Sequence, residues 1–481
     1  YHETLGGEFE FQKLYGMGDG LFDYLQKTYD TSVRVYAPVG EYKDLLAYLV
    51  RRLLENGANT SFVFNQQLVD PFIEAKKERE KLPTYEDLYP GRKNSRGYDL
   101  TDPSWIEYLV GRPSYEFITP EQLSVDDSIS VLDDGKKAWN ATPFEERKRL
   151  VLSYSDHLEI HMEQAASNLV THSHKTYSNA IGEVREAIDF IRYYTQQAEQ
   201  LYYQNGSNSY TGETNLTTYQ AHGVWMVIAP WNFPLALFVG PIVAALLTGN
   251  TVLAKSAPQT IKVAETAVSC MLESGIPDYA IRLCPTDPED AEIAVADERI
   301  KGITFTGSHK VAKRIQRVLA DRDGPIIPFI AETGGINCMI ADSTCLPEQL
   351  VTDVIHGAFD SAGQRCSATR FLFVQKDNAN VILKMLGNAI KVVQMGFSDD
   401  LNTDVTRVID GEAYRRIQNR LSVLEENEIL ISTRSRNGVE LPALTIPPSA
   451  YLVSDYRKYF DKEIFGPVLH VYEYDIDELP E

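Results

Sequence analysis

The chain has few cysteines, and they do not form the patterns that disulfide or metal sites usually show. Its 481 residues include five cysteines, an odd number, with no C-x-x-C pair and no histidine at metal-binding spacing. A disulfide framework and a zinc site are therefore not expected, and a reducing compartment fits best. Cys270, Cys284 and Cys338 lie in apolar helical or strand-like patterns and are expected to be core residues, whereas Cys366 has small, polar neighbours.

Long apolar runs and an excess of positive charge are also absent. No stretch reaches the roughly 18 consecutive apolar residues that cross a bilayer, and no secretory signal opens the sequence. The formal charge of −22 at pH 7 argues against a broad nucleic-acid-binding surface. We therefore expect a cytoplasmic protein with no nucleic-acid partner for this segment, and a peripheral contact with a membrane stays open.

What the sequence does contain is the pattern of an α/β protein, long enough for two or three domains. Between 223 and 340, short apolar runs alternate with helical patterns, which predicts βαβ units and a doubly wound parallel sheet. The alternation resumes after 345, which predicts a second α/β lobe. Long amphipathic helices are expected between 126 and 204. The predicted helices of the alternating region are near 260–274, 288–296, 308–320 and 378–394.

Polar residues follow two of the apolar runs where strands are expected to end. Asn232 stands between Pro230 and Pro234, where its amide either holds a bound oxygen atom or starts the next helix as an Asx turn. Lys255 ends the run NTVLAK, either as a solvated strand end or as a ligand for a ribose or phosphate. Doubly wound sheets bind ligands beyond the carboxyl ends of their strands, so both residues are candidates for one crevice.

Two further strand ends carry candidate groups. Gly307 and Ser308 come before a predicted helix, where they either bind a phosphate or only cap the helix. Glu332 follows an apolar run and precedes two glycines. In an apolar cleft its pKa would be raised, as suits a general base, whereas the plain alternative is a surface glutamate at a turn. Each signal is weak alone, and together with Cys366 they indicate a catalytic crevice.

The motifs that hold these residues resemble the aldehyde dehydrogenase superfamily from about residue 126 onward. The matching elements are IAPWNFP, NTVLAKSA, FTGS, AETGG, GQRC and EIFGP. Within the superfamily, FDSAGQRCSATR and AETGG are most similar to the glutamate-semialdehyde (pyrroline-5-carboxylate) dehydrogenase part of the bifunctional proline utilization A enzymes. EFEFQKL and VRVYAPV, near the start, are similar to the last β/α units of the proline dehydrogenase (β/α)8 barrel.

The resemblance implies a division of the chain and a bifunctional flavoprotein of proline catabolism and glutamate biosynthesis. The expected segments are the end of the proline dehydrogenase barrel at 1–68, a linker at 69–125, an NAD-binding domain at 126–331 and a catalytic domain at 332–481. Proline would be oxidised with FAD to pyrroline-5-carboxylate, and glutamate semialdehyde would be oxidised with NAD to glutamate. A homo-oligomer is expected, and reduction of a quinone would bring the protein to the inner membrane.

By the same resemblance, the catalytic residues are Cys366, Asn232 and Glu332. Cys366 would attack the aldehyde, Asn232 and the backbone N–H of Cys366 would hold the oxyanion, and Glu332 would activate water. Ser367 would help to bind the substrate carboxylate. The expected cofactor-binding residues are Lys255 for the adenosine ribose, Gly307 and Ser308 for the pyrophosphate, and Trp231, Glu463 and Phe465 near the nicotinamide.

A helix near the start of the chain carries the expected proline-binding residues. Tyr48, Arg51, Arg52 and Glu55 are spaced to share one helical face, and paired arginines suit a small carboxylate. A solvated helix with an Arg51–Glu55 ion pair is the plain alternative. The resemblance implies that Arg51 and Arg52 bind the proline carboxylate, and that Tyr36, Tyr48 and Glu55 line the same site beside FAD.

Two departures from the family pattern leave alternatives open. Pro258 stands where the family usually has a glutamate that binds the ribose hydroxyls, so the preference for NAD over NADP is less secure. The chain is also expected to be incomplete at both ends. An aldehyde dehydrogenase of other specificity with an unrelated N-terminal extension, and a non-catalytic homologue, are the competing hypotheses.

Overall fold

A computed structural model of the chain divides into two compact units, residues 1–82 and 83–481. The described residues are 10–15, 18–29, 32–41, 43, 45–48, 50, 87–100, 102, 105, 120–203, 210–284, 287–433 and 441–478. The described strands near the start of the chain belong to the first unit, and both α/β lobes belong to the second.

The first unit contains the β/α repeat predicted near the start of the chain. Strands β1 (Glu10–Leu14) and β2 (Ser32–Tyr36) pair in parallel, and helix α2 (Asp19–Tyr29) lies between them in sequence. Parallel neighbours need a crossover of this kind, because a tight hairpin reverses the chain direction. The two strands predicted in EFEFQKL and VRVYAPV are therefore confirmed, and they are neighbours in one sheet.

The larger unit is built on two five-stranded sheets, of which the first is entirely parallel. Its strand order is β5-β4-β3-β6-β7. The strands are β3 (Val224–Ile228), β4 (Thr251–Lys255), β5 (Ile281–Leu283), β6 (Ile300–Gly307) and β7 (Phe329–Thr333). The order moves outward from β3 in both directions, which is the doubly wound arrangement that the sequence predicted.

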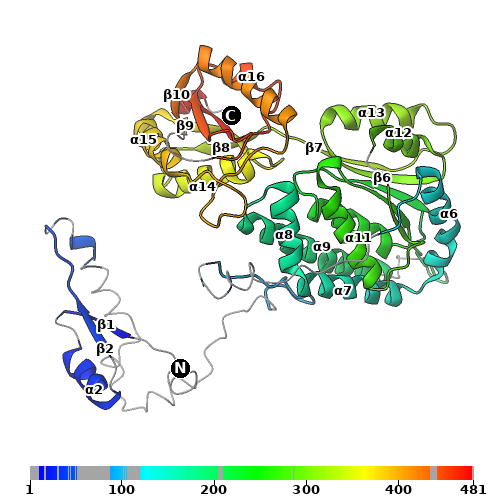
Figure 1. The fold of residues 1–481 in the computed structure, drawn as a ribbon, viewed down its shortest axis with the longest axis horizontal. Helices are drawn as coiled ribbons and strands as arrows, with labels where there is room; N and C mark the ends of the chain where they lie inside the picture. The colour runs from blue at the N-terminus through cyan, green and yellow to red at the C-terminus, as the bar shows by residue number, and fades with distance from the viewer. Residues whose placement is uncertain are drawn as a thin grey trace. The chain divides into compact units, whose positions relative to one another are not determined.

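Helices cover both faces of this first sheet (Figure 1). They are α6 (Val125–Ala141), α7 (Phe144–Ile160), α8 (Met162–Ser173), α9 (Tyr177–Tyr203), α10 (Ala236–Leu247), α11 (Ile261–Glu273), α12 (Pro288–Ala296) and α13 (His309–Ala320). Strand β3 shows why both faces must be apolar: Val227 packs into the core with α7 to α11, and Val224 and Met226 pack with α6, α12 and α13. The strand is buried on both sides, as a parallel sheet requires.

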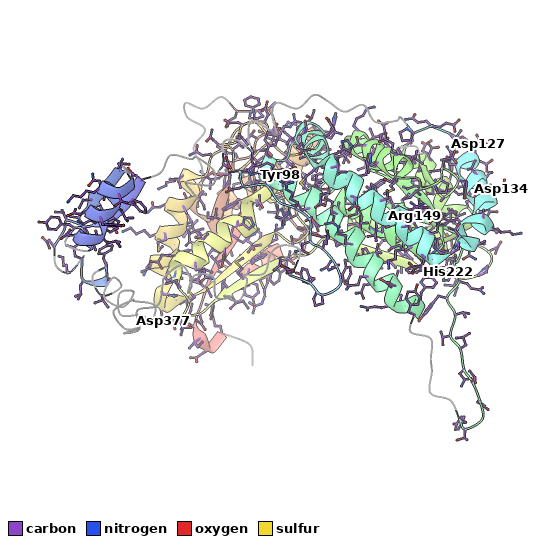
Figure 2. The ribbon with its side chains drawn as sticks, turned by 90° about the horizontal axis from the view of Figure 1, so that it is seen from below. Tyr98, Asp127, Asp134, Arg149, His222 and Asp377 are labelled. Atoms are coloured by element: carbon purple, nitrogen blue, oxygen red, sulfur yellow. The ribbon has the colours of Figure 1, made fainter. Side chains whose placement is uncertain are left out.

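Helix α6 illustrates the amphipathic pattern predicted between 126 and 204. Ile129 and Leu132 are fully buried against the sheet, whereas Asp127 and Asp134 are exposed on the outside of the lobe (Figure 2). Residues three or four apart share one face of a helix, so this spacing gives one apolar and one polar side. Among the helices that the structure describes, none combines the length and the apolar character that a membrane crossing needs.

The second sheet has the order β10-β11-β12-β9-β8 and is parallel except at its edge, where β10 runs antiparallel to β11. Its strands are β8 (Asn337–Ala341), β9 (Thr369–Gln375), β10 (Ile429–Thr433), β11 (Ser449–Leu452) and β12 (Val468–Tyr474). Apolar residues of α14 (Pro347–Phe359), α15 (Lys376–Val392) and α16 (Gly411–Asn427) complete its core. The second predicted α/β lobe is confirmed.

The passage between the two sheets places the candidate residues. Strand β7 belongs to the first sheet, β8 belongs to the second, and only residues 334–336 join them (Figure 1). The chain therefore crosses from one lobe to the other immediately after Glu332. This brings the carboxyl end of β7 to the lobe that carries Cys366.

Candidate active site

Cys366 lies on a turn of residues 360–368, called here the Cys366 turn, between α14 and β9. The side chains of Cys366 and Ser367 are exposed, whereas Gln364 and Ala368 on either side of them are buried. The turn therefore exposes a thiol and a hydroxyl to solvent, while neighbouring residues of the same turn are packed in the protein interior. This is the display that a nucleophile requires.

The other cysteines have different surroundings. Cys270 and Cys284 are buried, and burial raises the pKa of both thiols, that of Cys284 to about 12. Because the thiolate is the reactive form, such thiols are poor nucleophiles at neutral pH. Cys338 is exposed on the edge strand β8, so the prediction that it is a core residue was wrong. Exposure thus distinguishes Cys366 from Cys270 and Cys284. Cys338 is also exposed, and it differs from Cys366 in lying on a strand and not on a turn.

An unusual backbone leads into the Cys366 turn. Ser361, Ala362 and Gly363 have φ angles of 53°, 55° and 65°, so three consecutive residues are left-handed. Side chains other than glycine rarely adopt this conformation, which costs roughly 1–2 kcal/mol per residue. At Gly363 a Cβ atom would also overlap the backbone of Gly466. The turn therefore needs strong contacts from its surroundings to keep this shape.

Arg370, at the start of β9, supplies several of these contacts. It is 2% exposed, although it carries a full charge. Its guanidinium donates to the carbonyl oxygens of Gly363 (2.8 Å), Arg365 (2.9 Å) and Gly466 (3.2 Å) and pairs with the carboxylate of Glu463 (2.7 Å). One buried cation therefore holds the Cys366 turn against the EIFGP segment.

Glu463 joins a third segment to this pair. It receives a hydrogen bond from the backbone N–H of Gly335, and a Cβ atom at Gly334 would overlap its carboxylate. Burial raises the pKa of Glu463, and the neighbouring Arg370 opposes the rise. The carboxylate therefore fastens the loop after β7 to Arg370. Its expected role at the nicotinamide ribose stays a prediction.

Two aromatic residues expected near the nicotinamide are in contact. The rings of Trp231 and Phe465 meet edge to face with their centroids 5.6 Å apart. The guanidinium carbon of Arg370 lies 5.5 Å from the centre of the Phe465 ring. Trp231 follows β3 of the first sheet and Phe465 precedes β12 of the second, so this contact also bridges the two lobes.

Asn232 reaches the Cys366 turn from the end of β3. Its side-chain nitrogen donates to the carbonyl oxygen of Gln364 at 3.1 Å, two residues before Cys366. An amide nitrogen carries two hydrogens, so this contact orients the group and leaves the second hydrogen for a bound oxygen. The structure thus brings the Asn232 amide to the turn that carries Cys366, and its role as an oxyanion donor stays a prediction.

Glu332 differs from its expectation. It lies on β7, paired with Thr306, and its side chain is exposed instead of lying in an apolar cleft. The strand is the edge of its sheet, and the described residues leave Glu332 open to solvent. The start of β8, four residues beyond the end of β7, does approach the nucleophile, because the Asn337 side chain donates to the carbonyl oxygen of Cys366 at 2.7 Å. The desolvation on which the sequence argument depended is not seen.

Of the expected cofactor residues, Lys255 lines a separate cavity in the first lobe. Lys255 is buried, so the alternative of a solvated strand end was wrong, and burial lowers the pKa of its amine. It lines a cavity of about 180 Å³ whose walls are mainly apolar side chains of α12 and α13. The lining also contains the ion pair of Glu292 and Arg314. This mainly apolar slot with polar groups in its lining has the character of a small-molecule site. The Pro258 ring lines the same cavity, so no carboxylate enters it from that position.

Ser308 has the more common of its two expected roles. Its hydroxyl caps helix α13 by accepting the backbone N–H of Val311 at 3.4 Å. Gly307 precedes it at the end of β6. A helix N-terminus can also bind a phosphate, and this second role of Gly307 and Ser308 stays a prediction.

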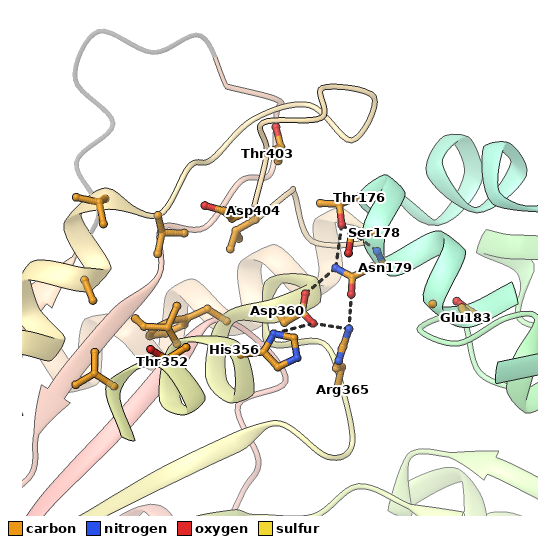
Figure 3. Close-up of a pocket in the computed structure, with 18 of the residues that line it drawn as sticks. Thr176, Ser178, Asn179, Glu183, Thr352, His356, Asp360, Arg365, Thr403 and Asp404 are labelled. Atoms are coloured by element: carbon orange, nitrogen blue, oxygen red, sulfur yellow. Dashed lines mark hydrogen bonds and ion pairs between the residues drawn. The ribbon is translucent and has the colours of Figure 1, made fainter. Parts of the chain in front are cut away.

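A larger cavity of about 750 Å³ lies beside the Cys366 turn, between α9 and α14 (Figure 3). Its polar lining contains residues that sequence reasoning did not identify, among them Asn179, Glu183, Asp360 and Arg365. Asp360 and Arg365 lie within the motif FDSAGQRCSATR that contains Cys366, so proximity in sequence was a usable signal for them. Asn179 and Glu183 come from a distant amphipathic helix, and no local pattern marks them.

The proline-site residues are only partly described. The hydroxyl oxygens of Tyr36 and Tyr48 lie 3.5 Å apart in the first unit, consistent with a shared site. Arg51, Arg52 and Glu55 lie outside the described residues. Their binding role stays a prediction.

Comparison with known proteins agrees with this geometry. Residues 111–479 match the aldehyde dehydrogenase family, and residues 2–65 match proline dehydrogenase. The chain belongs to the aldehyde dehydrogenase family. Among similar proteins, the bifunctional protein PutA of Escherichia coli is 37% identical over 99% of this chain and 40% of its own length. The 1-pyrroline-5-carboxylate dehydrogenase of Anoxybacillus flavithermus is 30% identical over 71% of this chain and 67% of its own length.

Solved structures show the same relationship. Proline utilization A from Bradyrhizobium japonicum (the D779W mutant) superposes with a TM-score of 0.83 at 38% identity, covering 98% of this chain and 50% of that one. A Thermus 1-pyrroline-5-carboxylate dehydrogenase with bound NAD gives a TM-score of 0.69 at 28% identity, covering 73% of this chain and 69% of that one. This aldehyde dehydrogenase chain thus spans about 40% of the length of the PutA proteins that it matches.

We expect Arg370→Met to destabilise the catalytic lobe by about 3–5 kcal/mol, because it leaves the Glu463 carboxylate buried without its partner. Arg420→Met is the matched control, since Arg420 pairs with the more exposed Asp461 at 3.2 Å and should cost only about 0–1 kcal/mol. Urea unfolding followed by circular dichroism measures both. Equal losses in the two variants would contradict the role given to Arg370.

Two glycine-to-alanine substitutions should have opposite effects on the free energy of unfolding. Gly363→Ala places a Cβ atom against the backbone of Gly466 in a left-handed conformation, so we expect a loss of about 1–3 kcal/mol or more. Gly182→Ala, in helix α9, meets no atom within 4 Å and should gain roughly 0.5–1 kcal/mol. Differential scanning calorimetry measures both. A Gly363→Ala protein as stable as the parent would show that the turn has another backbone shape.

Proposed function

We propose that this chain belongs to a bifunctional enzyme of proline catabolism. One activity would oxidise proline to pyrroline-5-carboxylate with FAD, and the other would oxidise glutamate semialdehyde to glutamate with NAD. The observation that carries the second activity is an exposed thiol at Cys366 on the turn whose Gln364 carbonyl oxygen the Asn232 amide contacts. The similarity to PutA proteins and 1-pyrroline-5-carboxylate dehydrogenases supports the choice of substrate.

The chemistry begins at Cys366. Its thiolate attacks the aldehyde carbon, and the carbonyl oxygen takes up the negative charge as the carbon becomes tetrahedral. Asn232 and the backbone N–H of Cys366 are the donors for that oxygen. The Cys366 turn suits this step, because its thiol is exposed to the substrate while the buried residues around it keep the backbone in place.

The second half of the reaction needs water. Bound NAD supplies the acceptor for the hydride that leaves the aldehyde carbon. What stays on the protein is a thioester between the substrate and Cys366, and water activated by Glu332 releases it as glutamate. The exposed position of Glu332 gives it direct access to water. Ser367, exposed beside the nucleophile, would bind the substrate carboxylate.

The residues in the crevice fit NAD. The apolar slot between α12 and α13 suits the adenine, and Lys255 at its end suits the ribose. We assign the pyrophosphate to Gly307 and Ser308 and the nicotinamide to the region of Trp231, Glu463 and Phe465. In this proposal residues 126–331 hold the cofactor and residues 332–481 carry the nucleophile.

The first activity is supported by the match of residues 2–65 to proline dehydrogenase and by the adjacent Tyr36 and Tyr48. In this proposal residues 1–68 contribute to a proline site beside FAD, with Arg51, Arg52 and Glu55 as further ligands, and residues 69–125 are a linker. We further propose that the protein is a cytoplasmic homo-oligomer that reaches the inner membrane when it reduces a quinone.

The test is Cys366→Ser in the full-length protein. A serine hydroxyl is a much weaker nucleophile than a thiolate, so aldehyde-dependent NAD reduction should fall by at least about 1,000-fold. Proline-dependent dye reduction should persist, and Cys338→Ser should leave both activities intact. Retained aldehyde oxidation in Cys366→Ser would refute the assignment of the nucleophile. A strong preference of the parent protein for aliphatic aldehydes over glutamate semialdehyde would refute the choice of substrate.

A further inference from the structure

Two side chains of the Cys366 turn and one of α9 form a closed ring of hydrogen bonds and an ion pair (Figure 3). Asn179 donates from its amide nitrogen to Asp360 at 2.6 Å, and Arg365 donates to the amide oxygen of Asn179. Arg365 also pairs with the second oxygen of Asp360 at 2.7 Å. Each member therefore contacts the other two, and Arg365 immediately precedes the nucleophile.

The polarity of this ring admits only one arrangement. Asp360 accepts only, Arg365 donates only, and Asn179 does both, so its oxygen must face the arginine and its nitrogen the carboxylate. If the Asn179 amide were flipped, its N–H groups would face the Arg365 guanidinium and its oxygen would face the Asp360 carboxylate, and neither pair could form a hydrogen bond. Thr176, just before α9, is compatible with this orientation, because its hydroxyl oxygen accepts a hydrogen bond from the Asn179 amide nitrogen at 3.0 Å.

The ring connects two parts of the molecule that are distant in sequence. Asn179 and Asp360 are separated by 181 residues, with Asn179 on α9 beside the first sheet and Asp360 at the start of the Cys366 turn. The residues after Asn179, Ala180 and Ile181, are buried in the core of the first lobe. The amide is therefore presented from a firmly packed helix.

Two members of the ring also form hydrogen bonds with the left-handed segment of the turn. Asp360 accepts the backbone N–H of Ser361 at 3.0 Å, and Arg365 donates to the Ser361 hydroxyl at 3.2 Å. These contacts stabilise a backbone shape that a serine rarely adopts. The position of Cys366 thus depends on contacts that Asn179 completes.

We propose that Asn179 is a positioning residue for Cys366, acting through Asp360 and Arg365 from the opposite lobe. The inference rests on the proposed aldehyde oxidation. Binding of the adenosine end of the cofactor should not depend on the ring, because no residue of the ring lines the slot beside Lys255. Loss of the ring should therefore lower the rate of the chemical step and leave NAD affinity alone.

The first test is Asn179→Ala in the full-length protein. We expect kcat to fall by roughly 10–100-fold, since a small misplacement of a reacting group can cost that much. The Kd for NAD, measured by isothermal titration calorimetry, should not change. Asn168→Ala is the control, because the Asn168 amide also joins two helices, donating to Thr266 at 2.8 Å, and lies outside the ring.

The second test exchanges the polar groups of the ring. Asn179→Asp keeps the size of the side chain but sets one carboxylate against another, so kcat should fall at least as far as in Asn179→Ala. Adding Asp360→Asn restores one carboxylate and one amide beside Arg365. The double variant should therefore be faster than Asn179→Asp alone. If the ring served packing alone, the losses from the two substitutions would add, and the double variant would have the lowest kcat of the set.

A readout independent of turnover completes the design. Alkylation of Cys366 by iodoacetamide, compared by mass spectrometry with that of Cys338 in the same sample, should change in Asn179→Ala and not in Asn168→Ala. If Asn179→Ala matches Asn168→Ala in both kcat and labelling, the positioning role is overturned while aldehyde oxidation stands. If the parent protein does not oxidise the aldehyde, the proposed function fails, and the labelling ratio still decides the role of Asn179.

Discussion

The guanidinium of Arg370 is the contact on which the candidate site depends. It brings a charge into the interior and uses it to bind three carbonyl oxygens and one carboxylate. A buried charge is costly unless its hydrogen bonds are satisfied, so the arrangement is stable only while the Cys366 turn and the EIFGP segment keep their positions. Arg370 thus holds the turn from the protein interior, and the Cys366 thiol stays at the surface.

A second buried ion pair also joins separate segments. Lys175 and Glu183 form a fully buried pair at 2.8 Å, and Glu183 also accepts the first backbone N–H groups of α10 at Leu235 and Ala236. Such pairs add little net stability, because desolvation offsets their attraction. They do penalise any arrangement that separates the partners, so we read them as devices that select one geometry of the crevice.

The sequence was informative where local physics decides the structure. Helix α12 begins at Pro288 and α13 follows Ser308 as predicted, because proline suits a first helical turn and serine caps one. Cys366 and Asn232 were found through their motifs. For Glu332 the sequence left an apolar cleft and an exposed surface both open, because its exposure depends on what packs against β7. Asn179 was missed because its partner Asp360 is 181 residues away, and Arg370 because a strand-end arginine does not reveal its burial.

The short link between β7 and β8 has a mechanical consequence. The candidate base belongs to one sheet and the candidate nucleophile to the other, and the chain passes between them through Gly334, Gly335 and Ile336. Glycine torsions are the softest in a polypeptide. Here Glu463 restrains them, because it accepts the backbone N–H of Gly335 and fills the space beside Gly334. The spacing between the candidate base and the candidate nucleophile is therefore tied to the same buried ion pair that supports the Cys366 turn.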